Sequence, residues 1–561
     1  MFKKTDKNTQ LDMYFAPDSV LNGRSLALYQ EKSSWHNVFR KDVLTGLKED
    51  IFECLFSKDN GAPNASIRVL VCMMVLKEMQ GLSDSQLYEQ CRFNLLTRSA
   101  LGLLNMSDPV PVESTYYLFR KRIVEYEKET GINLLEKAFS QLTSDQIKEF
   151  QVNGKLLRMD SKLIGSNIAW YSRYELIHEA VRVFCKSREK YIQKRNLAPS
   201  DIALLKSIMD EGGNKVVYRS SKTEITMRMK ELGVLTYKLL AIFRKFPGDD
   251  YDMLKKVFYG QFSVGENKEV VPLEKDKIES TSVQSPHDTD CTYRNKDGNK
   301  VKGYSANVTE TCNQEKGALN LITDVKVDKV TTADSTFFAP AVESSQEKFS
   351  EKVEEVYADG AYHSPDNQAF CKENNMELIT QAIQGTESRY EFSQEEETGN
   401  ILVTDTVTGQ IIPARKSISK KDNSVKWVIK TAENKPRYFT NKDIENFRLR
   451  QIIKNTPRDK LNIRNNVEAT IFQLCYHFSN DKTKYRTLCK HKMWANLRAI
   501  SINFGRILKY VKQTCQRTLF PSNQALKIQL ENACLTFIFI FNHIFIYNTH
   551  KFSPKPDFST F

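Results

Sequence analysis

The order of segments between residues 300 and 380 restricts the fold more than any other feature of this sequence. Two runs of alternating apolar and polar residues, KVKGYSANVTET and ALNLITDVKVDKV, flank Gly317 and predict a β-hairpin. A helix near 337–353, the strand EEVYADGAY, a short helix from Pro365 and the strand MELIT follow. Together with the earlier strand LLRMDSKLIGSN, these segments predict an α/β core.

Two carboxylates fall where strands of this core are expected to end. The first strand surfaces at Asp160, and Asp359 stands at the carboxyl end of an apolar strand, just before Gly360. Asp160 by itself is typical of a turn or cap residue. In an open sheet, however, ligands collect at the carboxyl ends of strands near the point where the strand order changes. We therefore expect Asp160 and Asp359 to be neighbours.

A third acid lies on a predicted helix. In RNNVEATIFQLCYHF, apolar residues at helical spacing from Val467 to Phe478 form a stripe, and Glu468 falls at its edge. A glutamate at the edge of a core-facing stripe is costly to desolvate unless a cation meets it. Arg464, one turn earlier, offers a salt bridge, and a divalent metal is the other candidate.

The net charge of +13 is concentrated in one segment. Between Arg448 and Arg517 there are 16 Lys and Arg residues against 3 Asp and Glu, so the rest of the chain sums to zero. Aromatic and amide residues are interleaved with these cations, as contacts with nucleic acid require. A solvated helix face is the alternative. We expect DNA-backbone contacts from the basic residues after Glu468, namely Lys482, Lys484, Arg486, Lys490 and Lys492.

Length and cysteine usage exclude several other classes of protein. At 561 residues the chain is too long for one ordinary core, so several domains are expected. The 11 cysteines include no CxxC pair and no zinc-ligand spacing, which predicts buried thiols in a reducing cytoplasm. The apolar run from Cys534 to Tyr547 is shorter than a membrane span and contains Asn542 and His543. We expect it to be a packed C-terminal strand or helix and not a membrane anchor.

Residues 1–150 are predicted to be helical. ASIRVLVCMMVLKEM carries an apolar face and stops at Gly81, and Ser83 and Gln86 stand at capping-box spacing to open the next helix. The two helices joined by GLSD are either a helix-turn-helix that reads DNA or a helical hairpin used for packing or dimerisation. A third helix, from near Ser114, carries a basic run that favours DNA contact: Arg120, Lys121 and Arg122.

These motifs resemble those of bacterial insertion-sequence transposases of the DDE type. VLKEMQGLSDSQLYEQCRFNLLTRSALGL and DPVPVESTYYLFRKRI are similar to the InsH-type helical N-terminal domain. RMDSKLIGSNIAW, KVKGYSANVTET, EVYADGAYHS and RNNVEATIFQL are similar to a ribonuclease-H-like catalytic core with a mixed sheet. The resemblance implies a catalytic triad of Asp160, Asp359 and Glu468, with Arg464 orienting the glutamate or touching phosphate.

The resemblance also implies an activity and its partners. The enzyme would cut DNA strands at element ends and transfer them into target DNA, with the three acids holding two Mg²⁺ ions, for which Mn²⁺ can substitute. Its partners would be double-stranded DNA (terminal inverted repeats and target) and a second copy on DNA, at the nucleoid in the cytoplasm and without a membrane. Three rival interpretations are a ribonuclease-H-like nuclease without strand transfer, a non-catalytic, transposase-derived DNA-binding protein, and a membrane-associated protein that would depend on the C-terminal apolar run.

The sequence departs from the family pattern at several positions. Leu461 and Cys475 stand where the family signature often has a tyrosine and a lysine, so the lysine's phosphate contact would come from Lys482 or Lys484, or be absent. Residues 385–441 lack the cysteines common in relatives and contain strand-like runs (RYEFSQ, NILVTDTVTGQII, SVKWVIKT, RYFTN), which predicts a β-rich insertion. Trp427 in this insertion would either stack on a flipped base or belong to the core.

The expected organisation has five parts. They are a helical N-terminal domain for DNA binding or dimerisation (1–150), a first core segment with a helical insertion at about 175–262 (151–384), the β-rich insertion (385–441), a second core segment with Glu468 and the basic residues (442–520), and a C-terminal tail (521–561). Asp334 and His363 lie near the active strands, and we expect them at the surface; the alternative is that they support the catalytic acids by contacting them.

Overall fold

The computed structural model describes residues 1–5, 11, 16–195, 197–296, 298–382, 387–395, 400–418, 425–431 and 435–519. The tail 521–561, with its apolar run, lies outside this range. Within it, no helix combines the length and hydropathy that crossing a bilayer requires. The chain divides into two compact units, Met1–Arg506 and Ile507–Phe561. The sheet and the sites described below lie in the first unit.

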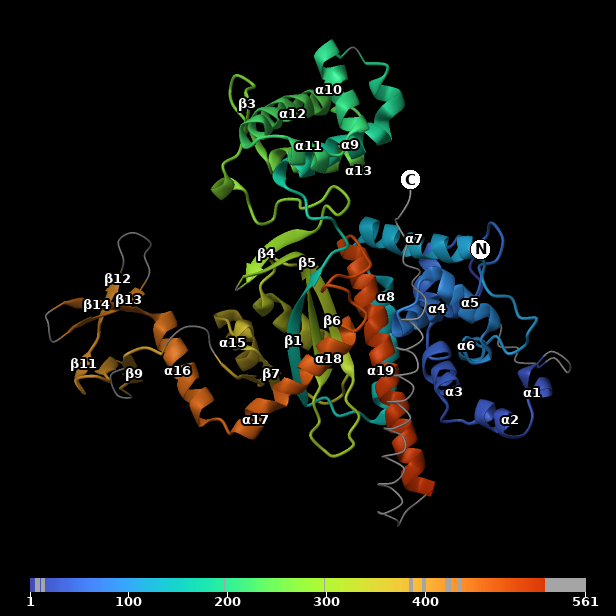
Figure 1. Ribbon diagram of the computed structural model, residues 1–561. Coiled ribbons are helices and arrows are strands. Elements are labelled where there is room, and N and C mark those ends of the chain that lie inside the picture. Colours follow the sequence, from blue (N-terminus) through green and yellow to red (C-terminus); the bar gives the residue numbers. More distant parts are fainter. Residues whose placement is uncertain are drawn as a thin grey trace, which may run out of the picture. The chain divides into compact units, whose positions relative to one another are not determined.

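A mixed six-stranded sheet forms the core of the first unit (Figure 1). Its strands are β1 (Leu156–Gly165), β4 (Thr292–Lys296), β5 (Asn299–Thr311), β6 (Ile322–Lys329), β7 (Glu355–Ala358) and β8 (Glu377–Thr380). The order is β4-β5-β1-β7-β8, with β6 also paired to β5. β5 runs antiparallel to β1, β4 and β6, whereas β7 runs parallel to β1 and β8. This confirms the expected α/β class and the predicted strand succession, to which β4 is an addition.

The first strand does not end at Asp160, as the sequence suggested, but continues to Gly165. The reason is that β1 has two different neighbours. On one side, β5 stays paired with it from Leu157 to Gly165. On the other side, β7 pairs with it only as far as Arg158. Asp160 therefore lies in mid-strand, just beyond the point where β7 stops pairing with β1.

Helices cover the apolar face of β1 and β7. Leu157 and Met159 of β1 and Val356 of β7 share a core with Phe338 of α14 (Phe338–Gln346). The polar face of α15 (Pro365–Glu373) points outward, and Cys371 joins this core. α14 is shorter than predicted because the Gln346 side chain accepts a bond from the Val353 amide and donates to the Glu351 carbonyl. These bonds turn the chain back into β7.

The N-terminal region is helical, as predicted. Its elements are α1 (Pro17–Val20), α2 (Gly23–Gln30), α3 (Trp35–Phe39), η1 (Arg40–Leu44), η2 (Glu49–Leu55), α4 (Ile67–Gln80), α5 (Asp84–Phe93), α6 (Leu95–Ala100), α7 (Glu113–Thr130) and α8 (Leu134–Phe150). α4 is buried along most of its length and ends at Gly81, whose φ of 69° is left-handed. Ser83 and Gln86 form both bonds of the expected capping box. The burial of α4 makes it the core helix of this region.

The helical insertion follows β1 and has a hydrophobic core of its own. It contains α9 (Arg173–Ile192), α10 (Pro199–Asp210), α11 (Gly213–Arg219), α12 (Lys222–Phe243) and α13 (Asp249–Tyr259). Phe184, Phe243 and Phe258 are fully buried in that core. The hairpin of β2 (Phe262–Val264) and β3 (Val270–Pro272) and the short η3 (Lys275–Lys277) lead the chain back to the sheet.

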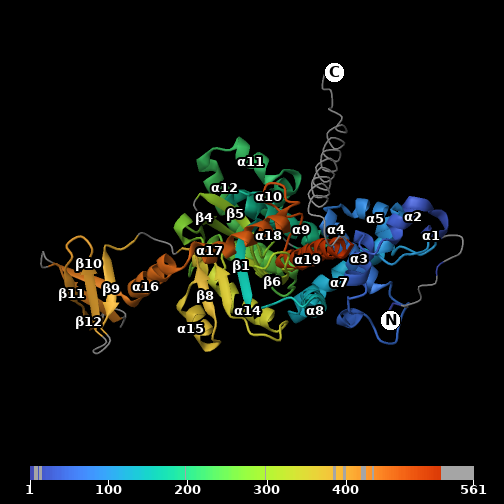
Figure 2. The ribbon, with the colours of Figure 1, turned by 90° about the horizontal axis from the view of Figure 1, so that it is seen from below.

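The β-rich insertion consists of two three-stranded sheets. One contains β9 (Tyr390–Gln394), β10 (Ile401–Asp405) and β11 (Ile411–Pro413), and the other β12 (Arg415–Ile418), β13 (Val425–Lys430) and β14 (Pro436–Thr440). The run NILVTDTVTGQII is a hairpin and not one strand, because the chain turns at Gly409, whose φ is +69°. α16 (Asn441–Asn455) packs on both sheets and leads towards α17 (Arg458–Asn462), as Figure 2 shows.

Candidate active site

The register of the sheet places Asp160 beside Asp359. The last parallel pair between β1 and β7 is Arg158 with Tyr357. Each aspartate lies two residues beyond its member of that pair, so the two are adjacent at the divergence of the strands. Asp359 also caps the short helix η5 (Gly360–Tyr362), and the Gly360 amide donates to its Oδ1 at 2.7 Å. The expected neighbourhood of the two acids is therefore present.

Arg464 connects Asp160 to Glu468. It lies in η6 (Ile463–Asn465), immediately before α18 (Asn466–Cys475), which packs on β1 in Figures 1 and 2. Its guanidinium is 2.8 Å from Asp160 Oδ2 and 3.6 Å from Glu468 Oε1. The Arg464 side chain is 13% exposed, whereas that of Glu468 is 64% exposed. The salt bridge considered for Glu468 from sequence is present, and the same arginine also reaches the first aspartate.

The electrostatics of Asp160 show that the arginine does not fully compensate its burial. Burial raises the pKa of Asp160, and the negative charge of Asp359 raises it further. The Arg464 guanidinium and the Ser161 amide lower this pKa, but the net direction is upward. Arg464 contacts two of the three acids, and the charge of Asp359 acts on Asp160 as well, so the site carries an excess of negative charge.

A network of polar side chains lies beside the two aspartates, on the interior side of the site. The Ser161 hydroxyl donates to Asp334 Oδ1 at 2.6 Å, and the Tyr362 hydroxyl donates to Asn307 Oδ1 at 2.6 Å. The expectation that Asp334 lies at the surface is wrong, since Asp334 is 8% exposed. Its carboxylate accepts the hydrogen bond of the Ser161 hydroxyl, directly after Asp160 in β1. His363 is half-buried, and burial lowers its pKa.

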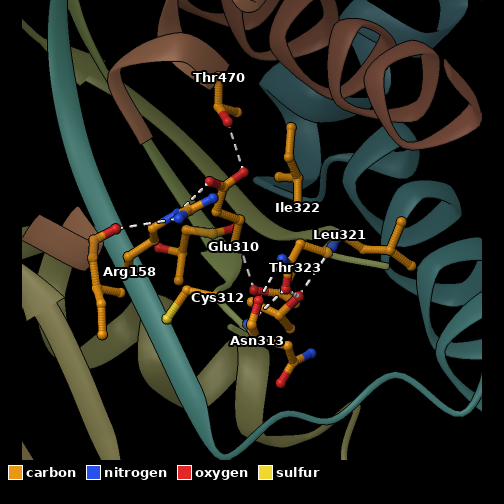
Figure 3. Close-up of polar contacts among 12 residues, drawn as sticks. Arg158, Glu310, Cys312, Asn313, Leu321, Ile322, Thr323 and Thr470 are labelled. Carbon is orange, nitrogen blue, oxygen red and sulfur yellow. Dashed lines mark hydrogen bonds and ion pairs between the residues drawn. The ribbon is translucent and has the colours of Figure 1, made fainter. Parts of the chain in front are cut away.

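A second, fully buried carboxylate anchors α18 to the sheet (Figure 3). Glu310 of β5 stands directly opposite Arg158 of β1, and Arg158 Nε donates to it at 2.6 Å. Arg506 also pairs with Glu310 at 2.7 Å, and the hydroxyl of Thr470, in α18, donates to it at 2.7 Å. Arg158 further donates to the Ile463 carbonyl at 3.2 Å. The segment carrying Arg464 and Glu468 is thus tied to both central strands.

This anchor is electrostatically satisfied. Burial would raise the pKa of Glu310, but the charges of Arg506 and Arg158 and the bond from Thr470 outweigh burial, so its pKa lies below the usual value. Sequence reasoning missed Glu310, Arg158 and Arg506. The available signal was an acid in the apolar strand that follows KVKGYS and an arginine two residues before Asp160. In neighbouring buried strands, such charges require each other.

The basic residues of α7 differ in their accessibility. Arg120 donates to both carboxylate oxygens of Asp84 at 3.2 Å and is 20% exposed. Lys121 is 67% exposed and lies 3.5 Å from Glu125, one turn along the helix. The Arg122 guanidinium lies over the Phe56 ring at 5.5 Å from its centre. Lys121 is thus the most accessible cation of the three.

The basic segment after α18 is partly used inside the protein. Lys482 donates to the Ile168 carbonyl, Lys484 to the Gly81 carbonyl and Arg486 to the Asn167 carbonyl. Lys492 lies 3.5 Å from Glu127, and Lys490 is exposed at the start of α19 (Leu488–Leu519). Carbonyl contacts leave the positive charge of a lysine or arginine uncompensated, so the first three remain available to a polyanion.

Trp427, the predicted stacking residue, lies on β13. Its ring packs against the core of the β-rich insertion and is partly buried. The indole N–H donates to Asn441 Oδ1 at 2.8 Å. Stacking on a base stays a prediction for this residue.

The oxygen-only donors of the three acids fit a hard divalent cation. Among the residues that the structure describes, no three or more His, Cys, Asp or Glu side chains stand close enough together to hold a metal ion. Asp160 and Glu468 are linked through Arg464, which contacts both carboxylates.

The fold places this chain in a general class. A sheet with the order β6-β5-β1-β7-β8, in which three antiparallel strands precede two parallel ones, is a ribonuclease-H-like core. Two family models match: Transposase domain (DUF772) over residues 39–122, and Transposase DDE domain over residues 278–504. The chain therefore belongs to the insertion-sequence transposases of the DDE type, whose members generally use divalent metal ions.

The family matches also show what is particular to this chain. The DDE match includes Asp359 and Glu468 but begins after the helical insertion, so Asp160 on β1 lies outside it. No curated protein and no solved structure matches the chain significantly.

Proposed function

We propose that this transposase cleaves DNA strands at the ends of its element and joins them to target DNA, with Asp160, Asp359 and Glu468 as catalytic carboxylates. The observation that carries this proposal is the position of Arg464, whose single guanidinium spans Asp160 and Glu468 while Asp359 lies in register beside Asp160. Three acids around one cation favour the binding of further positive charge.

Two Mg²⁺ ions, or Mn²⁺ in their place, are the cations we propose, held by these three carboxylates. When bound, they would activate a water and stabilise the leaving 3′ oxygen of a phosphodiester. Asp160 would hold the ions together with Asp359, which lies beside it in register, and Glu468, with which it shares Arg464. Gly360 holds the Asp359 carboxylate in place. Arg464 orients Asp160 before metal enters and could then pair with a phosphate oxygen.

The DNA partners in this proposal are the element's terminal inverted repeats and target DNA. The basic residues after α18 would hold the DNA backbone, together with Lys121 of α7 and, to the extent that they are accessible, Arg120 and Arg122. We propose the five-part organisation with the bounds given above. Two element ends must be brought together, so a homodimer on DNA is the expected assembly.

The test is strand cleavage of DNA that carries the sequences flanking the coding region. Asp160→Asn, Asp359→Asn and Glu468→Gln should each lower Mg²⁺-dependent cleavage by roughly a thousandfold or more, while DNA binding is retained. Glu373→Gln, a change to an exposed acid at the end of α15, is the matched control and should cut normally. If an acid variant of the site cuts at the wild-type rate, its assignment is wrong. A substrate with a pre-cut end separates a transposase, which joins it to target, from a nuclease, which does not.

A further inference from the structure

An exposed tryptophan and a group of unneutralised cations lie where β1 leaves the sheet. Trp170 belongs to the short segment between β1 and the helical insertion and is 49% exposed. The Lys302 ammonium, from β5, lies over its ring, 5.1 Å from the ring centre. The chain just after β1 stays paired with β5, since the Ser166 amide donates to the Lys302 carbonyl, and this brings the segment with Trp170 close to Lys302.

Lys302 has no acid partner among the described residues. Burial lowers the pKa of this lysine, and the positive charge of Lys482 lowers it further. Two cations that repel each other beside a partly buried aromatic ring are costly unless an anion comes between them. The arrangement therefore favours an anionic ligand.

The backbone fixes Lys482 at this place. The Gly165 amide donates to the Asp481 carbonyl at 2.8 Å, and the Thr483 amide donates to the Gly165 carbonyl at 2.9 Å. A Cβ on Gly165 would approach the Lys482 side chain to 2.9 Å, so glycine allows this close pairing. Arg486, exposed, reaches the Asn167 carbonyl from the same segment at 2.6 Å.

A further cation on β1 lies between the proposed catalytic acids and this group of lysines. Lys162 lies two residues beyond Asp160, on the same strand face, and is exposed. From Asp160 to Gly165 the strand advances about 17 Å, which corresponds to about five nucleotide steps of a duplex. A DNA strand whose scissile phosphate lies at Asp160 would reach this surface within one half-turn.

We propose that Trp170, Lys302, Lys482 and Lys162 form a track for DNA next to the cleavage site, in which the lysines contact the backbone and Trp170 stacks on an unpaired base. The positive charge suits the phosphates, and an exposed indole beside cations is suited to a base without sequence preference. This proposal rests on the proposed function and adds a binding site in the segment between β1 and α9. It differs from the possible role of Trp427, which lies in the β-rich insertion.

The test measures binding by the full chain in EDTA, so that no cleavage takes place. The probe is an oligothymidine of about 20 nucleotides, longer than a typical single-strand site. Trp170→Ala should weaken binding roughly tenfold and remove part of the fluorescence quenching that the probe causes. Trp170→Phe should restore much of the affinity, because a phenyl ring also stacks. Trp35→Phe, at a half-buried tryptophan of α3 that belongs to neither proposed site, should leave both quantities near the wild-type values.

The lysine part of the track is tested by salt dependence. Lys302→Gln should lower the slope of log K against log salt by about 0.7 for the oligothymidine, whereas Lys372→Gln, on exposed α15, should leave it unchanged. Unchanged affinity and quenching in Trp170→Ala, or an unchanged slope in Lys302→Gln, would overturn the track. Because binding is measured without metal, these outcomes are independent of whether the acid variants abolish cleavage.

Discussion

Two carboxylate clusters lie on the contact between α18 and the central strands, and they differ in charge balance. Glu310 is fully buried and is met by two arginines and a threonine hydroxyl. The cluster of Asp160, Asp359 and Glu468 has three acids, and of these its one arginine, Arg464, contacts Asp160 and Glu468. Both clusters use residues from β1 and from α18 or its entry, so the difference does not come from the fold. It comes from the number of cations that the sequence supplies.

The comparison separates a structural network from a ligand-binding one. The Glu310 cluster is complete without any ligand, as the lowered pKa of its carboxylate indicates. The Asp160 cluster is not, since the pKa of Asp160 is raised. A raised carboxylate pKa favours folding below about pH 4 and opposes it as pH rises through the folded value, so ionised Asp160 costs stability at neutral pH. We infer that a bound cation offsets this cost.

The largest expected effect on stability is at Glu310. Glu310→Gln leaves two buried arginines without their charge partner and should lower the free energy of unfolding by about 3–5 kcal/mol. Thermal or urea unfolding of the full chain checks this. Glu125→Gln, which removes an exposed partner of Lys121, is the control and should change little.

Asp160→Asn should keep or raise the melting temperature at neutral pH. Equal destabilisation by Glu310→Gln and Asp160→Asn would erase the distinction between the two clusters.

A smaller effect is expected at a third closed network, at the far end of β1. His491 is fully buried, with Nδ1 2.8 Å from the Thr487 carbonyl oxygen and Nε2 2.8 Å from the Thr483 hydroxyl. Burial lowers its pKa from 6.5 to about 4. Unfolding lets this histidine bind a proton below pH 6.5, so its contribution to stability is complete above that pH and is lost as pH falls towards 4.

Between pH 7 and pH 5 the loss due to His491 should be about 2 kcal/mol. His491→Gln should therefore narrow the difference in melting temperature between these two pH values. The measurement compares the wild type and the variant at both pH values in one buffer series. A variant that keeps the full pH dependence would show that other groups cause it.

Much of the core could be predicted from sequence because its signals are local. Alternation in KVKGYSANVTET and the Gly317 turn gave the hairpin, and apolar runs ending near Asp160 and Asp359 placed the two acids together. The extension of β1 past Asp160 could not be predicted, because it depends on which neighbour pairs over which length. The hairpin turn at Gly409 was missed because one alternating run continues through it.

The candidate site was less accessible to sequence reasoning than the fold. Glu468 drew attention by its place at the edge of an apolar stripe, but its expected role and that of Arg464 came from the resemblance to the DDE transposases. The contact of Arg464 with Asp160, 304 residues apart in sequence, required the tertiary structure. The same is true of Asp334, which surface statistics favoured as exposed although Ser161 holds it in the interior. Strand register decides which residues become partners of a buried charge, and the spacing of residues in the sequence does not reveal that register.

The most direct test of the central claim is Mn²⁺ binding to the full chain without DNA, measured by calorimetry. The wild type should bind Mn²⁺, and Asp160→Asn, Asp359→Asn and Glu468→Gln should each weaken binding at least tenfold, whereas the exposed-acid control Glu373→Gln should bind as the wild type does. If all three variants bind Mn²⁺ with wild-type affinity, the acids that surround Arg464 do not form the metal site of this transposase.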